Sequence, residues 1–300
     1  MSALSAQSLT KIIGDRTIVD DVSFDLQPGE VFGFLGPNGA GKTTTIRMLV
    51  GLIKPTQGVV TVCGFDLRRD FEKAVRCIGC IVENPDLYRF MTGRENLEHF
   101  ARMLSVSNGE IERVAALVNL SHRLEQRVGT YSLGMRQRLG IAQAMLGKPR
   151  VLILDEPANG LDPAGIREIR ELLRSLAAER GMAVFVSSHL LAEIELTADR
   201  VAIIHKGRIL RTGTVRELIS SQRAFELRVG DAERAAAILR DRGVETTVRE
   251  DILLAPIDES DVPPLITALA HEGIEVFHAR ARVHTLEEMF LDITGGETVD

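Results

Sequence analysis

Short, continuously apolar segments alternate along the chain with longer segments in which apolar residues recur every three or four positions. Apolar runs without alternation are typical of strands buried on both faces, and a period near 3.6 is typical of helices. The apolar runs lie at 31–35, 78–82, 151–154, 183–186 and 201–204. A helix is expected at 164–179, between two of these runs. Strands that alternate with helices in this way predict an α/β fold with a parallel sheet covered on both faces.

Two regions interrupt this alternation. Residues 17–26 are rich in β-branched and apolar residues and precede a Pro-Gly turn, which predicts a further strand near the start of the chain. From about residue 84 to 145 the period is helical throughout. Thr92 and Glu95 stand in the spacing of a capping box, with apolar residues behind them at helical intervals. We therefore expect a helical subdomain at about 84–145.

A different order begins after residue 220. Its two helices and four strands are expected at 225–229, 232–242, 244–249, 252–255, 262–272 and 274–277. This β-α-β-β-α-β order predicts a small α+β module of the ferredoxin-like kind. The chain is therefore expected to form two domains, residues 1–220 and 221–300.

Composition narrows the class of protein. The 300 residues carry a formal charge of −6, with 45% hydrophobic and 26% charged residues, so disorder and fibrous repeats are excluded. An acidic chain disfavours a generally basic surface for nucleic acid. The first residues lack a charged start followed by an apolar block, and no uncharged apolar run approaches the roughly 18 residues of a membrane span. Neither a signal peptide nor a transmembrane helix is expected.

Three cysteines are an odd number, which excludes a full disulfide framework. Cys77 and Cys80 form a C-x-x-C pair that could be a redox pair, half a zinc site, or two small apolar residues in a buried strand. No second pair supplies further metal ligands, and Cys63 stands alone. The buried-strand interpretation is therefore favoured.

A glycine-rich loop at 36–43 fits the pattern G-x-x-x-x-G-K-[ST] between the strand at 31–35 and a helix expected at 43–52. Its glycines allow successive N–H groups to cradle phosphate oxygens, and the helix adds the positive end of its dipole. Lys42 is expected to reach the β- and γ-phosphates, and the Thr43 hydroxyl to bind Mg²⁺. The predicted nucleotide-binding residues here are Gly36, Pro37, Asn38, Gly39, Ala40, Gly41, Lys42, Thr43 and Thr44.

The strand at 151–154 ends in two carboxylates, Asp155 and Glu156. Parallel α/β sheets bind ligands at the edge where such strands end. Asp155 is expected to hold Mg²⁺ through its water shell, and Glu156 to polarise an attacking water as general base. One acid alone could be a helix cap, but with the phosphate loop the pair indicates a nucleoside triphosphatase.

Four further motifs follow the phosphate loop and the helical insert in order: Ser132-Leu-Gly134-Met-Arg-Gln, Leu154-Asp-Glu156-Pro, Gly160-Leu-Asp162-Pro and Ser188-His189. Together these motifs resemble the ATPase subunit of an ATP-binding-cassette (ABC) transporter over about residues 4–220. The resemblance implies a P-loop NTPase cassette with a parallel-sheet core, an antiparallel β edge and an α-helical subdomain. It also implies ATP and Mg²⁺ as cofactors.

The resemblance assigns roles to these motifs. Two cassettes, either two copies of this chain or one copy and a paralogous ATPase subunit, would meet head to tail with two ATP molecules between them. Ser132 and Gly134 of one copy would close on the γ-phosphate held by the phosphate loop of the other. Asp162 would lie at the dimer seam, and His189 would hydrogen-bond the γ-phosphate and orient water beside Glu156.

Two positions depart from the usual pattern of relatives. Glu83 stands where most carry a glutamine that contacts Mg²⁺ or water and senses the membrane subunit. A carboxylate can bind Mg²⁺ more strongly but repels the γ-phosphate. The segment 78–97 resembles ATPases of bacitracin- and lantibiotic-resistance exporters, which share this glutamate; the alternative is a solvated loop acid. Ile13 stands near the usual adenine-stacking aromatic, so looser base selectivity is expected.

The resemblance favours one function over two alternatives. It implies an ATP-hydrolysing subunit that powers export of a drug, peptide antibiotic or lipid-linked molecule. The subunit would dock its helical block on a separate integral-membrane permease at the cytoplasmic face of the cell membrane. A soluble ABC-type ATPase acting on nucleic acid or ribosomes is disfavoured because the chain has one cassette, no coiled-coil or zinc-bearing insertion and an acidic balance. A degenerate regulator is disfavoured because Lys42, Asp155, Glu156 and His189 are intact.

The end of the chain carries no clear chemical site. Residues 286–295 resemble the last helix of drug-exporter ATPases, and plain packing or dimer support is the favoured role. The module at 221–300 is accordingly expected to be an accessory or dimerisation domain.

Overall fold

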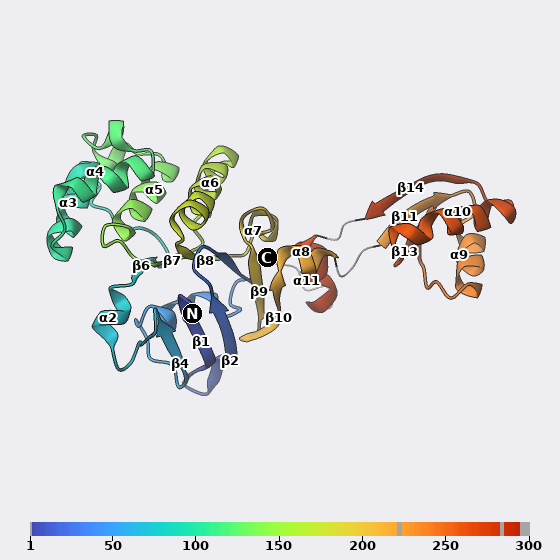
Figure 1. The fold of residues 1–300 in the computed structure, drawn as a ribbon, viewed down its shortest axis with the longest axis horizontal. Coiled ribbons are helices and arrows are strands. Elements are labelled where there is room, and N and C mark those ends of the chain that lie inside the picture. The colour runs from blue at the N-terminus through green and yellow to red at the C-terminus, as the bar shows by residue number, and fades with distance from the viewer. Residues whose placement is uncertain (1, 221–223, 283–284, 295–300) are drawn as a thin grey trace. The chain divides into compact units, whose positions relative to one another are not determined.

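The computed structural model describes residues 2–220, 224–282 and 285–294. The chain divides into two compact units, Met1–Gly213 and Thr214–Gly295 (Figure 1). Each unit contains its own sheet and its own cluster of buried apolar side chains. No helix in the described ranges is both long enough and apolar enough to cross a bilayer.

The first unit is built around a six-stranded sheet of order β10-β9-β3-β8-β7-β6. β3 (Val31–Leu35) lies between β8 (Ala183–Ser188) and β9 (Arg200–His205), and β7 (Val151–Asp155) joins β8 to β6 (Ile78–Ile81). All these pairings are parallel, and every residue of β3, β7 and β8 is buried. The parallel core expected from the unalternating apolar runs is confirmed. Because the strands are parallel, the residues that follow them gather at one edge of the sheet.

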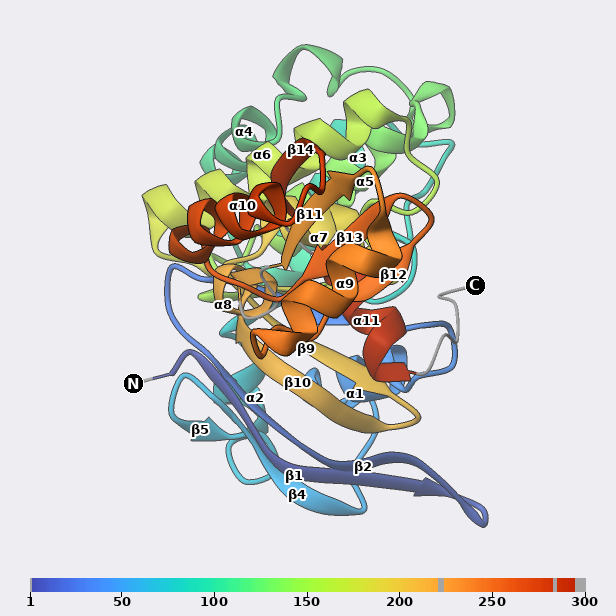
Figure 2. The ribbon, with the colours of Figure 1, turned by 90° about the vertical axis from the view of Figure 1, so that its right-hand side faces the viewer.

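An antiparallel sheet of order β2-β1-β4-β5 forms the second layer of this unit (Figure 2). Its strands are β1 (Leu4–Ile13), β2 (Arg16–Leu26), β4 (Gln57–Val62) and β5 (Phe65–Asp66). Phe24 of β2 stacks on Phe32 of β3 with ring centroids 5.3 Å apart, and Phe185 of β8 packs on both rings. Offset aromatic stacking adds to the apolar burial that holds the two sheets together.

Helices cover the parallel sheet and supply its connections. α1 (Lys42–Leu49) begins at the phosphate loop and ends before the expected residue 52, because Gly51 takes a left-handed φ of 78° beyond its last turn. The other helices of this part of the unit are α2 (Phe71–Val75), α6 (Pro163–Arg180) and α7 (Leu191–Thr197), and β10 (Arg208–Thr214) is the outermost strand of the six-stranded sheet, beside β9.

The helical subdomain follows β6, where Figure 1 shows its three helices gathered beyond that edge of the sheet. They are α3 (Gly93–Leu104), α4 (Asn108–Leu117) and α5 (Leu133–Ala144), with short 3₁₀ turns at Ser121–Arg123 and Val128–Thr130. The expected capping box is present, because Thr92 and Glu95 each accept a hydrogen bond from the other's backbone N–H.

The cysteines do not lie as the sequence suggested. Cys80 is exposed, because β6 is the outermost strand of its sheet. Cys63 does not stand alone: burial and the neighbouring thiol of Cys77 together raise the pKa of Cys63 to about 11. A thiol with so high a pKa is protonated at neutral pH and is a poor nucleophile.

The second unit has the expected β-α-β-β-α-β order. It contains β11 (Ala224–Val229), α9 (Ala232–Asp241), β12 (Thr247–Arg249), β13 (Ile252–Ala255), α10 (Val262–His271) and β14 (Val276–Arg282), with α8 (Val215–Ser220) before and α11 (Leu286–Thr294) after. The sheet order β12-β13-β11-β14 is antiparallel throughout, as in ferredoxin-like modules. The last strand begins two residues later than expected and is longer, and Gly295 of the expected tail lies outside the described residues.

Candidate functional site

The phosphate loop connects β3 to α1 at the carboxyl edge of the parallel sheet. A Cβ at Gly36 would meet the carbonyl oxygen of Ile204 at 2.2 Å, so the backbone passes where only glycine fits. Gly39 and Gly41 take φ values of 79° and 107°, a region that favours glycine. Within the described chain no side chain caps α1, and its first turn holds no acid. The N–H groups at this helix start are therefore available to an anion.

Lys42 folds back over the loop from the start of α1. Its side chain is only 6% exposed, and its Nζ donates to the carbonyl oxygens of Gly36 at 2.6 Å and Pro37 at 3.3 Å. The same Nζ lies 3.2 Å from Oε1 of Glu156, the residue that follows β7. The lysine of the loop and the expected general base are thus in direct contact.

Glu156 is held by both backbone and side-chain contacts. Its φ is 49°, and its N–H donates to the hydroxyl of Ser187 at 3.0 Å. Its carboxylate oxygen Oε2 lies 2.7 Å from Nδ1 of His189 and also accepts the His189 backbone N–H at 3.3 Å. The carboxylate is therefore shared between Lys42 and His189. The fold brings together the three residues expected to act in catalysis, from α1, β7 and β8.

Asp155 and Thr43 supply oxygen atoms to the same edge. Asp155 is 2% exposed and accepts a hydrogen bond of 2.5 Å from the hydroxyl of Ser187. The Thr43 hydroxyl makes no hydrogen bond to any described residue. A hydroxyl and a carboxylate suit Mg²⁺, which is held by one or two carboxylates together with substrate phosphates. The part of the chain that the structure describes contains no cluster of three acidic, histidine or cysteine side chains that could hold a metal ion.

Ser187 was not among the residues singled out from the sequence. It is fully buried at the end of β8, where its hydroxyl donates to Asp155 and accepts from the N–H of Glu156. The available signal was a hydroxyl residue at the end of an apolar strand, immediately before Ser188-His189. Ser187 therefore links the carboxylate of Asp155 to the backbone of Glu156.

Glu83 lies two residues beyond β6, with a left-handed φ of 69°. Its carboxylate forms an ion pair with the guanidinium of Arg47, which projects from α1. Both side chains are partly open to solvent, with 59% of Glu83 and 44% of Arg47 exposed. Glu83 therefore reaches the helix of the phosphate loop through Arg47 and makes no described contact with the loop itself.

The remaining expected site residues make no contact with Lys42, Glu156 or His189 among the described residues. Ser132 is exposed and accepts from the N–H of Met135 as the cap of α5, and Asp162 accepts from the N–H of Gly165 as the cap of α6.

The segments around these two caps are neighbours. A Cβ built at Gly134 would lie 3.8 Å from the side chain of Leu161, and one at Gly160 would lie 3.3 Å from Leu133. Ile13, at the end of β1, is 55% exposed. The chain thus presents these positions on its surface instead of folding them onto its own phosphate loop.

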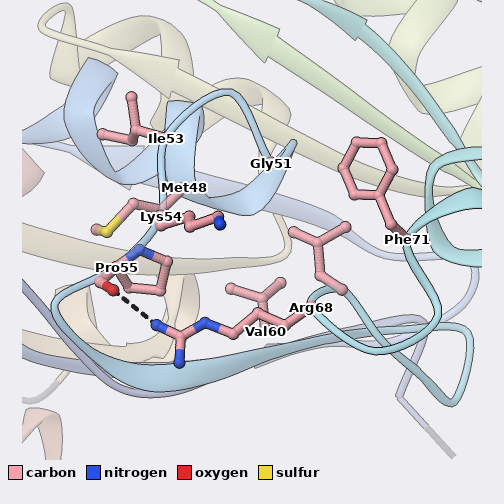
Figure 3. Close-up of a pocket in the computed structure, with 9 residues that line it drawn as sticks. Met48, Gly51, Ile53, Lys54, Pro55, Val60, Arg68 and Phe71 are labelled. Atoms are coloured by element: carbon pink, nitrogen blue, oxygen red, sulfur yellow. Dashed lines mark hydrogen bonds between the residues drawn. The ribbon is translucent and has the colours of Figure 1, made fainter.

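A cavity of about 580 Å³ lies near the other end of α1 and is lined by none of the site residues (Figure 3). Met48 and Val60 lie on its apolar side, and the guanidinium of Arg68 donates to the carbonyl oxygen of Pro55 at 2.6 Å. The phosphate loop starts α1, whereas this cavity surrounds the helix end, so the two features are separate.

The chain is similar to known proteins along nearly its whole length. Residues 19–159 match the family model described as ABC transporter. The chain is 49% identical over 297 residues to the uncharacterised ABC transporter ATP-binding protein YhcH of Bacillus subtilis (strain 168), covering 98% of this chain and 96% of that protein. It is 40% identical over 301 residues to the bacitracin transport ATP-binding protein BcrA of Bacillus licheniformis, covering 99% and 98%.

Solved structures show the same similarity to ATP-binding subunits of ABC transporters. A structure described as the ATP-binding subunit of an ABC transporter superposes with a TM-score of 0.65 at 32% identity, covering 73% of this chain and 93% of that one.

Proposed function

Because the chain belongs to the ATP-binding proteins of ABC transporters, which hydrolyse ATP to power transport, we propose that it drives export of a peptide antibiotic or similar drug through a separate membrane permease. The observation that carries the export step is the end-to-end similarity to a bacitracin transport ATP-binding protein, 40% identical over 301 residues. A lantibiotic transport ATP-binding protein, SrtF of Streptococcus pyogenes, is also 40% identical over 232 residues.

In the proposed site, the N–H groups at the start of α1 and the Lys42 ammonium bind the triphosphate. Thr43 and Asp155 hold Mg²⁺, which when bound neutralises charge on the phosphate oxygens. The contact between Lys42 and Glu156 supports an exchange of partners: phosphate oxygens take the lysine and free the Glu156 carboxylate to accept a proton from water. His189 holds that carboxylate through Nδ1 and orients the water.

A second cassette completes each site in this proposal. Ser132 and Gly134 of the second copy cover the γ-phosphate, and Asp162 lies at the seam. Their surface positions, away from the chain's own Lys42, support this arrangement. Ile13, exposed at the end of β1, is the proposed adenine contact.

The permease is proposed to bind the helical subdomain on the inner face of the cell membrane. Large apolar side chains are exposed there, including Tyr88, Phe90 and Met103, of which Phe90 and Met103 are about 70% exposed. Exposed apolar patches of this kind typically mark protein interaction sites. The unit from 214 onward is proposed to be an accessory or dimerisation module.

Antibiotic susceptibility tests the export step. The chain is produced in a bacitracin-sensitive Bacillus host together with a candidate permease taken from the reading frames next to its gene, and inhibitory concentrations of bacitracin and nisin are measured. We expect a rise of at least several-fold for one of the two. Cells that produce only the cassette or only the permease should show no rise in inhibitory concentration. Cells that produce the pair with Lys42→Ala should show none either. If the intact pair leaves both values unchanged while the purified chain hydrolyses ATP, the proposed substrate class is wrong although the ATPase assignment stands.

A further inference from the structure

We propose that Arg47 is a positioning residue that neutralises Glu83, so that an acid can stand at the phosphate edge where a neutral side chain would otherwise be needed. The inference rests on the proposed function and on the expectation, drawn from the resemblance, that position 83 faces the Mg²⁺ and the phosphates when nucleotide is bound. Nothing in the motifs of the chain marks Arg47, because it lies outside the phosphate loop.

The ion pair connects two distant parts of the cassette. Arg47 projects from α1, and Glu83 follows β6 with its backbone in the left-handed region. Neither side chain has another charged partner among the described residues. The pairing is therefore mutual, and it ties the helix of the phosphate loop to the end of an outer strand.

Helix spacing and strand pairing place the ion pair at the same edge of the sheet as the expected metal ligands. Thr43 and Arg47 are four residues apart on α1 and so lie on the same face of the helix. β6 pairs with β7 in parallel, with Ile81 level with Leu154. Residues just beyond both strands therefore emerge at the same edge, Glu83 from one and Asp155 and Glu156 from the other.

Charge explains why a cation is needed there. The edge collects three carboxylates, on Glu83, Asp155 and Glu156, and without Arg47 only Lys42 is described as a cation paired with any of them. A bound triphosphate adds further negative charge, and like charges repel strongly where water is partly excluded. The Arg47–Glu83 pair has no net charge, which is the property of the glutamine that the resemblance leads one to expect at this position. The carboxylate keeps its oxygens while its repulsion is offset.

An ordinary surface ion pair is the competing explanation. Exposed pairs contribute little to stability, and both partners here are partly exposed. Under that explanation, removing Arg47 would leave nucleotide binding unchanged, whatever residue stands at position 83. The two explanations therefore differ in whether Arg47 affects nucleotide binding at all, and in whether that effect disappears when Glu83 is absent.

A double-mutant cycle decides between them, using Arg47→Gln, Glu83→Gln and the combined variant. Binding of the fluorescent analogue TNP-ATP is measured by equilibrium titration with and without Mg²⁺, beside kcat and KM for ATP hydrolysis. Arg47→Gln should weaken TNP-ATP binding about tenfold, more at low salt than at high salt, since one unscreened negative charge then faces the phosphates. KM should rise with kcat changed less than about twofold. The combined variant should bind within about twofold of Glu83→Gln alone.

Controls separate this inference from folding and from the proposed nucleotide site. Arg208→Gln breaks a comparable exposed pair with Asp20, 2.6 Å long, and should leave binding unchanged. Thermal midpoints of all variants should stay within a few degrees of the parent. Equal weakening by Arg47→Gln with and without Glu83→Gln, or no weakening in either, would overturn the role of Arg47. Lys42→Ala should abolish TNP-ATP binding in every background; if it does not, the nucleotide site itself is misplaced.

Discussion

The parallel sheet of the cassette and the antiparallel sheet of the second unit place their polar residues differently. In the cassette, Asp155 and Ser187 end neighbouring strands, are buried, and are hydrogen-bonded to each other. In the second unit, Glu226 and Arg280 stand opposite each other within β11 and β14 and form an ion pair of 2.9 Å, with Arg280 mostly exposed. Parallel strands end at one edge and so converge their last residues, whereas antiparallel strands end at alternate edges.

The two sheets therefore differ in role: the parallel sheet carries the candidate catalytic residues, and the sheet of the second unit carries pairs that stabilise it. The cassette edge combines side chains from several strands around one point, which a phosphate-transfer site requires. The paired residues in the sheet of the second unit face their cross-strand neighbours and stabilise only that pairing. Each unit also has a separate apolar core, so a change in one is expected to leave the other largely unaffected.

The largest expected effect is that of Glu156→Gln on hydrolysis. The amide keeps the shape of the side chain but cannot take a proton from water, so kcat should fall by about 10²–10⁴. TNP-ATP should still bind, because Lys42 and the phosphate loop are unchanged. The matched control is Glu226→Gln in the second sheet, where steady-state ATPase assays should show no loss. A Glu156→Gln enzyme as fast as the parent would remove the general base from the proposal.

A core substitution in each unit tests their independence. Leu227 of β11 and Leu152 of β7 are both fully buried. Leu227→Ala should lower the free energy of unfolding of the second unit by about 2–5 kcal/mol. Its ATPase rate should stay within about twofold of the parent. Leu152→Ala should destabilise the cassette by a similar amount and lower the ATPase rate as well.

Urea unfolding followed by circular dichroism, with hydrogen exchange to locate the change, measures both effects. Loss of protection in the cassette of the Leu227→Ala protein would show that the two units unfold together. The separation of roles drawn above would then fail.

Removal of the Ser187 hydroxyl should have an intermediate effect. Ser187→Ala removes the hydroxyl that binds the buried Asp155 carboxylate and the Glu156 N–H, while that N–H keeps the Ser187 carbonyl oxygen at 3.2 Å, and the expected cost is about 1–2 kcal/mol. That corresponds to a fall of about fivefold to thirtyfold in kcat/KM. Ser188→Ala removes a hydroxyl that accepts only from the N–H of Leu190 in the described hydrogen bonds, and should cost less. Equal losses from both variants would show that Ser187 acts through packing alone.

The sequence predicted the residues of this site better than it predicted the side-chain contacts around them. Lys42, Glu156 and His189 were identified because each stands at a strand end or a helix start whose geometry follows from the local pattern. The partners of Glu83 and Cys63 were not, because each contact joins two elements that only the folded arrangement brings together.

The place of a strand within its sheet also cannot be predicted from the local sequence pattern. Exposure of Cys80 depends on β6 being outermost, which only the sheet order reveals. The sequence pattern predicts the start of β14 too early, because β14 is an edge strand whose mostly exposed and intermediate residues show no apolar period.

The smallest expected effect concerns a buried acid outside both sheets. Glu110 of α4 pairs with the guanidinium of Arg113 and lies 3.2 Å from Nζ of Lys148. Burial alone would raise the pKa of this carboxyl, but the two cations outweigh it and hold the pKa below 4.5. Because the folded pKa is the lower one, the stabilisation is present above the unfolded value and is lost as pH falls through the folded pKa.

Glu110→Gln should therefore lower the free energy of unfolding by about 1 kcal/mol at pH 7, the size expected for a pair whose cations remain partly hydrated. Urea unfolding of the variant and the parent should converge as pH falls through the lowered pKa of Glu110, because the carboxyl is then protonated in both states. Glu226→Gln, which breaks the Arg280 pair of the second sheet, should change the same quantity less, because that arginine is 62% exposed. A constant difference between Glu110→Gln and the parent at every pH would assign the effect to packing and not to charge.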